Sequence, residues 1–213
     1  MCGFARSSFG TGPLRQPNVS SMIILTSDRL RLRRLEADSQ ADAVFLVELL
    51  NQRSFIDNIA DRGVRSPDDA VRYMREGPLT SYEKFGFGLW LVERLADDTA
   101  IGLCGLLQRD YFEHPDIGYA LLDRHNGHGY AFEAAAATLA WGWNVGGMTR
   151  IVASTAPDNR DSIRLLEKLG FRFERILTLP AHGGESRYFV IDAPSWVARD
   201  IAEDQEGSQF SSR

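Results

Sequence analysis

The first half of the chain alternates between strand-like and helix-like patterns of apolar residues. Residues 30–33, Leu-Arg-Leu-Arg, alternate strictly and predict a half-buried strand. In residues 43–50, apolar side chains recur at helical spacing, after an Asp-Ser pair that can cap a helix. A second, short helix is predicted to begin at Ser66-Pro67, as N-cap and first helical residue, and to end at Gly77-Pro78. One strand and two helices therefore open the fold.

Three runs rich in strand-forming residues come next, in residues 85–92, 100–107 and 116–122. Only short polar segments separate them, so three antiparallel strands are predicted. From residue 122 the order changes to loop, helix, strand, helix, strand. The predicted elements are helix 130–145, strand 150–155, a helix from Asn159 to Gly170, and strands 171–175 and 187–191 after a turn at His182-Gly183-Gly184.

This order predicts an α+β fold. A mixed, mostly antiparallel twisted sheet would carry about four helices, with one parallel strand-helix-strand unit at its centre.

Composition indicates an ordinary globular domain. Of 213 residues, 44% are hydrophobic and 25% are charged, as expected for a single domain with a real core. The 24 Lys and Arg against 29 Asp and Glu leave a net charge of -5, which argues against a nucleic-acid-binding protein. No stretch reaches 18 uninterrupted apolar residues, so no membrane span is expected.

The two ends of the chain differ from its body. Residues 1–21 contain Arg, Ser, Gly and Pro but no acidic residue, which favours a disordered or mis-started leader over a targeting signal. The domain is expected to span residues 22–196, followed by a flexible polar tail, residues 197–213. Cys2 and Cys104 lie far apart in unlike contexts, so a reducing, cytoplasmic location is expected.

The most informative segment is a glycine loop between a predicted strand and a predicted helix. Gly127 and Gly129 allow a tight turn there, so that several N–H groups point at one spot at the helix N-terminus. Arg124 adds a side chain that can grip phosphate in a fork. The loop therefore indicates an anion site, with a plain glycine turn as the alternative.

Two other phosphate motifs do not match. A dinucleotide fingerprint needs a third glycine, and Phe132 stands in its place. A P-loop would need a Gly-Lys-Ser/Thr ending, which the segment lacks.

Four motifs in order resemble the GNAT superfamily of N-acetyltransferases, in the branch of the ribosomal-protein acetyltransferases RimJ and RimL. They are the start at residues 26–33, the strand Asp116-Ile117-Gly118-Tyr119-Ala120-Leu121, the loop Arg124-x-x-Gly127-x-Gly129, and Leu169-Gly170-Phe171. The resemblance implies acetyl-CoA as acetyl donor. It implies cofactor contacts to the pantetheine chain from Leu121 and Leu122, and to the pyrophosphate from Arg124, Asn126, Gly127, His128, Gly129, Tyr130 and Ala131. By the same resemblance, Asn159 and Ser162 would face the thioester end.

Acetyl transfer to an amine needs a group that removes a proton from the nucleophile. Asp116 is the first candidate, ahead of Glu113 and His114, and the alternative is a solvated residue that only begins its strand. Many members of the superfamily carry a catalytic Tyr where this chain has Leu166. The departure leaves Ser162 or Asn159 as hydrogen-bond donors to the thioester, with helix capping as the alternative for Asn159.

The acceptor side is predicted from strand alternation and from the family. Trp90 would share a strand face with Gly86 and Gly88 and border an acceptor groove, with a core tryptophan as the alternative. Asn58 and Arg62 lie in the region that shapes the acceptor pocket in this family.

No metal site is predicted. His125 and His128 lie three residues apart but have no Cys or carboxylate partner at ligand spacing.

The sequence thus predicts an acetyl-CoA-dependent N-acetyltransferase that transfers the acetyl group directly to a primary amine, in a protein N-terminus or a small molecule. A non-catalytic acyl-CoA-binding module is the alternative. Neither nucleic acid nor a membrane is an expected partner, and the protein would be a monomer or a homodimer.

Overall fold

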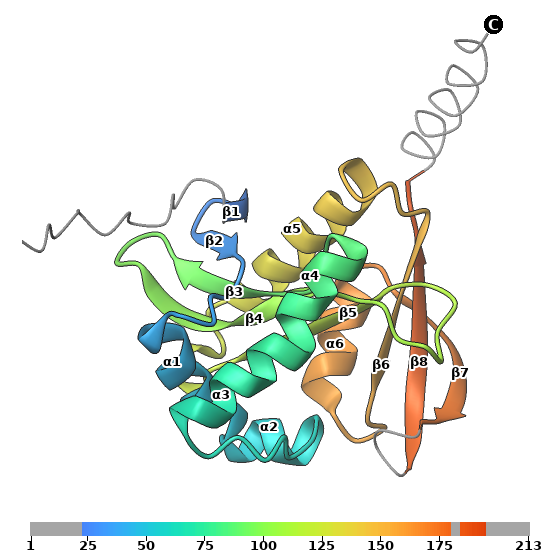
Figure 1. Ribbon diagram of the computed structural model, residues 1–213. Coiled ribbons are helices and arrows are strands. Elements are labelled where there is room, and N and C mark those ends of the chain that lie inside the picture. The colour runs from blue at the N-terminus through green and yellow to red at the C-terminus, as the bar shows by residue number, and fades with distance from the viewer. Residues whose placement is uncertain (1–22, 180–183, 195–213) are drawn as a thin grey trace, which may run out of the picture.

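The computed structural model describes residues 23–179 and 184–194. Its sheet has the strand order β1-β2-β3-β4-β5-β6-β8-β7 (Figure 1). The strands are β1 (Ile23–Thr26), β2 (Leu30–Arg33), β3 (Leu89–Arg94), β4 (Thr99–Leu107), β5 (Asp116–Leu121), β6 (Arg150–Thr155), β7 (Arg172–Thr178) and β8 (Glu185–Asp192). The predicted leader and tail, and residues 182–183 of the predicted turn, lie outside the described residues.

Six α-helices accompany this sheet within the described residues, two more than the four predicted. They are α1 (Gln40–Leu50), α2 (Arg53–Asn58), α3 (Pro67–Met74), α4 (Thr80–Phe85), α5 (Tyr130–Asn144) and α6 (Arg160–Lys168), with a π-helical turn η2 (Arg75–Leu79) and a 3₁₀ turn η3 (Asp123–His125). The predicted α+β class with a mostly antiparallel sheet is confirmed. None of the described helices is both long and apolar enough to cross a membrane.

Local capping chemistry sets the helix starts that the sequence indicated. The hydroxyl of Ser39 accepts the N–H of Asp42 at the start of α1. At the start of α3, Ser66 and Asp69 form a reciprocal capping box, and Pro67 occupies the first turn. Each cap satisfies donors that a helix N-terminus leaves free.

The predicted stop at Gly77-Pro78 is wrong. The chain continues from α3 through the π turn η2 into α4, with Pro78 buried inside the helical segment. A proline has no N–H, and the wider π turn accommodates that loss. The carbonyl of Arg75 accepts a hydrogen bond from the Thr80 hydroxyl at 2.7 Å.

The helical segment instead ends at Gly86, whose φ of 80° is the left-handed conformation that favours glycine. Strand β3 consequently begins at Leu89, four residues later than predicted. The predicted alternation of residues 85–88 along a strand is therefore wrong.

The two faces of the sheet carry separate cores. Trp90 and Cys104 belong to the cluster that packs against α5, whereas Leu91 and Leu103 belong to the cluster under α1 and α3. The period-2 alternation of β3 and β4 divides these side chains between the faces. Figure 1 shows α5 behind the sheet and the α1–α4 segment in front of it.

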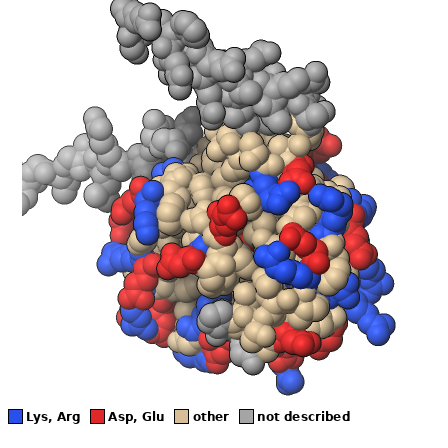
Figure 2. Space-filling model, turned by 90° about the vertical axis from the view of Figure 1, so that its right-hand side faces the viewer, with Lys and Arg blue, Asp and Glu red and all other residues tan. Residues whose placement is uncertain are grey.

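Strand β7 forms one edge of the sheet and carries many charged side chains. Arg150 and Arg172 both pair with Asp192, at 2.6 and 2.9 Å. Figure 2 shows basic and acidic side chains interspersed on the face at this end of the molecule. Charged side chains of this kind discourage pairing of the edge with another strand.

The feature that positions the site is the junction of β5 and β6. These two strands run parallel and pair in register only at Asp116 and Val152, whereas the other neighbours in the sheet are antiparallel. Beyond this pair the strands separate, so the backbone edge of β5 is left without a strand partner there. The sheet therefore opens a gap at its centre.

Candidate active site

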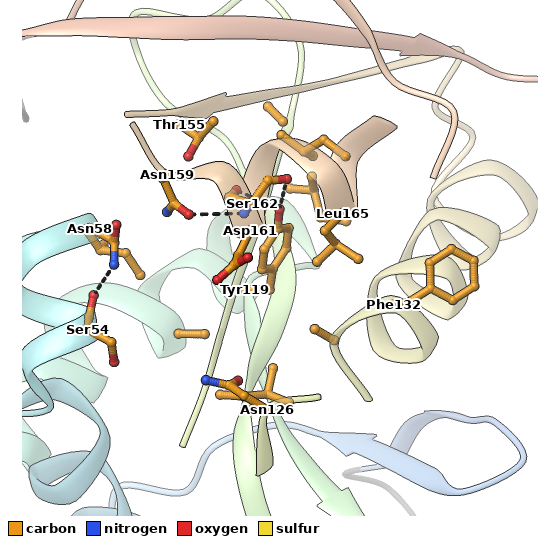
Figure 3. A pocket seen from close by; sticks show the side chains of 18 of the residues that line it. Ser54, Asn58, Tyr119, Asn126, Phe132, Thr155, Asn159, Asp161, Ser162 and Leu165 are labelled. Atoms are coloured by element: carbon orange, nitrogen blue, oxygen red, sulfur yellow. Dashed lines mark hydrogen bonds between the residues drawn. The ribbon is translucent and has the colours of Figure 1, made fainter. Parts of the chain in front are cut away.

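A cavity of about 680 Å³ occupies the gap between β5 and β6. Its walls come from α2, the edge of β5, the glycine loop, the first turn of α5, and α6 (Figure 3). Asn126 lies at one end, Asn58 and Ser54 on α2 form one side, and Phe132 on α5 faces them. The cavity therefore joins the predicted anion loop to the central strands.

The glycine loop has the backbone geometry that an anion site needs. Gly127 and Gly129 both have a φ of 79°, and Gly129 is the N-cap of α5. The N–H groups of residues 127–132 donate no hydrogen bond to any described residue. Free amides at the positive end of a 15-residue helix fit a phosphate or pyrophosphate group.

Six of the predicted cofactor residues line this cavity: Leu121, Asn126, Gly127, Gly129, Ala131 and Asn159. Leu122, Arg124, His128 and Tyr130 do not. Leu122 is fully buried in the core beneath α1 and α3. The His128 ring stacks on Tyr130, with the Arg29 guanidinium on the same tyrosine ring.

The side chain of Arg124 is not placed to bind phosphate, although the sequence predicted that it would be. Its guanidinium pairs with the carboxylate of Glu48 on α1, and Arg124 does not line the cavity. This ion pair engages the fork that was expected to bind phosphate. The backbone of the loop lines the cavity in this structure, and the Arg124 side chain does not.

Asp116 lies at the point where β5 and β6 separate, and it lines the cavity. Its side chain is 4% exposed, which contradicts the alternative of a solvated residue. Arg109 Nε donates to both of its carboxylate oxygens, at 2.9 and 3.0 Å. Burial raises the pKa of Asp116 to about 6, although the charge of Arg109 opposes the rise. A carboxylate of this kind can accept a proton near neutral pH.

The first turn of α6 forms another wall of the cavity. Asn159 Oδ1 accepts the N–H of Ser162 at 3.0 Å, so Asn159 is the N-cap of α6, the alternative that its sequence context allowed. Leu166 is buried and also lines the cavity. Ser162 is the residue of this turn that carries a hydroxyl group and lines the cavity.

Tyr119 is a lining residue that was not among the sequence-based candidates. Its hydroxyl lies 2.9 Å from Ser162 Oγ (Figure 3). Alternation along β5 could have placed Tyr119 on the same face as Ile117 and Leu121. Nothing in the spacing of the chain showed that this face meets α6.

On the acceptor side, the structure separates the three predicted residues. Asn58 lines the cavity and donates to the carbonyl of Ser54 at 2.8 Å. Arg62 is exposed in the loop before α3 and does not line it. Trp90 is 0% exposed and packs edge-on against Trp141 at 4.9 Å between ring centroids. Trp90 is thus a core residue and does not border the cavity.

Within residues 23–179 and 184–194, no three His, Cys, Asp or Glu side chains gather in a way that could hold a metal ion.

The chain belongs to the GNAT family of acetyltransferases. The family model described as "Acetyltransferase (GNAT) domain" matches residues 29–172. YkkB, an uncharacterized protein of Bacillus subtilis (strain 168), is 30% identical over 158 residues, which are 72% of this chain and 87% of YkkB. The uncharacterized N-acetyltransferase YoaA of the same organism is 30% identical over 157 residues, or 72% of this chain and 85% of YoaA.

Solved structures share the fold. A GNAT-family acetyltransferase from Bacillus anthracis aligns with a TM-score of 0.65 and 23% identity, over 80% of this chain and 98% of that one. RimL, a ribosomal L7/L12 α-N-protein acetyltransferase, aligns with a TM-score of 0.68 and 16% identity, over 80% and 94%. The microcin C7 self-immunity acetyltransferase MccE, in complex with acetyl-CoA and AMP, aligns with a TM-score of 0.65 and 17% identity, over 78% and 94%.

Proposed function

We propose that this protein transfers an acetyl group from acetyl-CoA directly to a primary amine. One observation carries the proposal: a single cavity joins free loop amides at one end to a buried Asp–Arg pair at the point where β5 and β6 separate. Transfer from acetyl-CoA needs a site for the anionic donor and a group that takes the proton of the amine, and these two features can meet both needs. A module that only binds acyl-CoA would not need the second.

The donor supplies an acetyl thioester when it is bound. The amides of residues 127–131 would hold its pyrophosphate, and the edge of β5 near Leu121 would hold its amide-bearing chain. An extended amide chain can add to a free strand edge through backbone hydrogen bonds. The separation of β5 and β6 exposes such an edge.

Asp116 removes the proton that the amine loses. With a pKa of about 6, it is mostly ionised at neutral pH yet remains basic enough to accept a proton. Arg109 keeps the carboxylate oriented by bonding to both oxygens through Nε. Asn58 and Ser54 lie on the wall across the cavity from α5, where an acceptor would enter.

Ser162 lines the cavity, and Asn159 caps the turn that carries the Ser162 hydroxyl. A hydrogen bond from this hydroxyl would stabilise negative charge at the sulfur or at the carbonyl oxygen. Because a thiol has a pKa of about 8.5, its thiolate leaves with modest assistance, and no tyrosine is required at the position of Leu166.

The acceptor can be a protein N-terminus, as the name of RimL states for that protein, or a small amine. The test is release of the CoA thiol from acetyl-CoA with a panel of N-terminal peptides and small amines. Turnover with peptides alone would select the first class, and turnover with small amines alone the second. Binding of acetyl-CoA without turnover on any acceptor would contradict the proposal and favour a binding module.

A further inference from the structure

The hydroxyl groups of Tyr119 and Ser162 form a pair that joins two walls of the cavity. Their oxygens lie 2.9 Å apart, and the Tyr119 hydroxyl is also 3.4 Å from the carbonyl oxygen of Ser162. Tyr119 comes from β5, whereas Ser162 comes from the first turn of α6. The pair therefore links the central strand to the helix that faces it.

We propose that Tyr119 is a positioning residue for acetyl transfer: its hydroxyl holds the hydroxyl of Ser162 so that the serine proton is directed at the departing sulfur. This inference rests on the function proposed above. In this arrangement Tyr119 orients the Ser162 hydroxyl, which could otherwise rotate about its C–O bond.

The 2.9 Å contact allows either hydroxyl to donate, and in the proposed arrangement Tyr119 is the donor. Burial raises the pKa of Tyr119 to about 12, so the phenol keeps its proton throughout the physiological range. A protonated phenol can donate to Ser162 Oγ, which has lone pairs to accept it. The serine hydrogen is then free to donate to a third group.

Without such a partner, a serine in a helix has a competing choice. Its hydroxyl can donate back to a backbone carbonyl three or four residues earlier, which would turn the proton away from the cavity. Donation from Tyr119 to the oxygen restricts the rotation of the Ser162 hydroxyl. The N-cap bond from the Ser162 N–H to Asn159 Oδ1 fixes the same residue from the other side.

The arrangement also divides the chemistry between the two faces of β5. Asp116 and Tyr119 are three residues apart, so the alternation of a strand directs them to opposite faces. In this proposal, proton removal from the amine takes place on one face of β5, and stabilisation of the leaving group on the other.

The atoms and electrons of the step balance. The amine nitrogen bonds to the acetyl carbonyl carbon, the carbon–sulfur bond breaks, and its electron pair goes to the sulfur. Asp116 takes the proton that the nitrogen loses. Ser162 donates a hydrogen bond to the forming thiolate, which then takes a proton from water.

The test compares the wild type with Tyr119→Phe, Ser162→Ala and the double variant. Tyr188→Phe is the matched control, because Tyr188 is a buried tyrosine of β8 outside the cavity. Kinetics with acetyl-CoA should show kcat reduced about tenfold or more in Tyr119→Phe, with KM for acetyl-CoA changed by less than about twofold, because only the developing charge is affected. In the Ser162→Ala background, Tyr119→Phe should have no further effect.

A second measurement does not depend on turnover. Calorimetric binding of CoA itself reports on the thiolate, because a hydrogen bond from Ser162 lowers the pKa of the bound thiol below about 8.5. The wild type and Tyr188→Phe should bind CoA about tenfold more tightly near pH 9 than near pH 7, and Tyr119→Phe no more than about threefold.

Two results would overturn the assignment of Tyr119. One is additive kinetic losses for Tyr119→Phe and Ser162→Ala. The other is a pH dependence of CoA binding in Tyr119→Phe that equals that of the wild type. If the wild type binds no CoA at any pH, the proposed function fails and the role of Tyr119 falls with it.

Discussion

Arg109 Nε lies 2.9 and 3.0 Å from the two carboxylate oxygens of Asp116, at the point where β5 and β6 separate. Arg109 is half-buried and Asp116 is buried, and both line the cavity. The ion pair lets the chain keep a carboxylate inside the protein, while burial keeps the pKa of that carboxylate high.

Replacing Asp116 by Asn should remove the proton acceptor. We expect kcat/KM for acetyl transfer to fall by about 10²–10⁴-fold, the usual contribution of general base catalysis. In the wild type, kcat/KM should rise with pH up to a plateau, with an apparent pKa of about 6, because only the ionised carboxylate accepts a proton. The variant should lack this limb.

Asp68→Asn is the matched control, since Asp68 is exposed in the first turn of α3 and does not line the cavity. A variant at Asp116 that kept the limb near pH 6 would show that another group is the base.

Replacing Arg109 by Gln should shift the acidic limb of the pH–rate profile, the rise of kcat/KM with pH, to higher pH. The positive charge of Arg109 opposes the burial that raises the pKa of Asp116. Without that charge the pKa rises further, so the limb should move to a pH above about 6. If the limb moves up by about one pH unit, kcat/KM at a pH well below it falls about tenfold. A pH–rate profile measures this, and a limb displaced toward lower pH would contradict the assignment.

Gly127→Ala should weaken binding of CoA. Both Gly127 and Gly147 have a left-handed φ, of 79° and 62°, with open space where a Cβ would be placed. Alanine at either position should therefore cost about 1 kcal/mol of folding stability. Only Gly127 lines the cavity and orients the loop amides.

We therefore expect calorimetry to show CoA affinity reduced about tenfold by Gly127→Ala, the loss of one good charge-assisted hydrogen bond. The same measurement should show no change with Gly147→Ala. Equal affinities in the two variants would argue against the loop as the anion site.

Glu133→Gln should destabilise the protein in a pH-dependent manner. The carboxylate of Glu133 accepts the Ser27 hydroxyl at 2.8 Å, the Arg29 N–H at 2.7 Å and Arg29 Nε at 2.6 Å. Burial raises the pKa of Glu133, but these hydrogen bonds and the charge of Arg29 outweigh it, so the pKa is lowered. The resulting stabilisation is present above the unfolded-state pKa of about 4.3 and is lost as pH falls through the folded-state pKa.

Urea unfolding near pH 7 should show a loss of about 1–3 kcal/mol in the variant, and the difference should shrink below about pH 4.3 and close once the pH is below the folded-state pKa. Glu83→Gln, on the exposed face of α4, should change stability little at either pH. A difference that persists at low pH would mean that shape, and not charge, explains the loss.

The prediction of local structure succeeded where interactions within a short segment determine its conformation. The Leu-Arg-Leu-Arg alternation of β2, the N-cap Ser66 followed by Pro67, and the glycine loop before α5 act over three or four residues. It failed at Pro78, because a π turn can absorb a proline inside a helix, and whether it does so depends on packing against the rest of the protein.

By itself, the sequence determined the order of elements, the α+β class, the glycine loop before α5 and the position of Asp116 at the start of a strand. These depend on periodicity, capping and turn chemistry, which neighbouring residues encode. Only the tertiary structure decided which side chains meet in the cavity. The pairing of Arg124 with Glu48, the burial of Trp90 against Trp141 and the contact of Tyr119 with Ser162 each join residues that are 43 or more positions apart. Such contacts arise when strands and helices pack, and no local pattern records them.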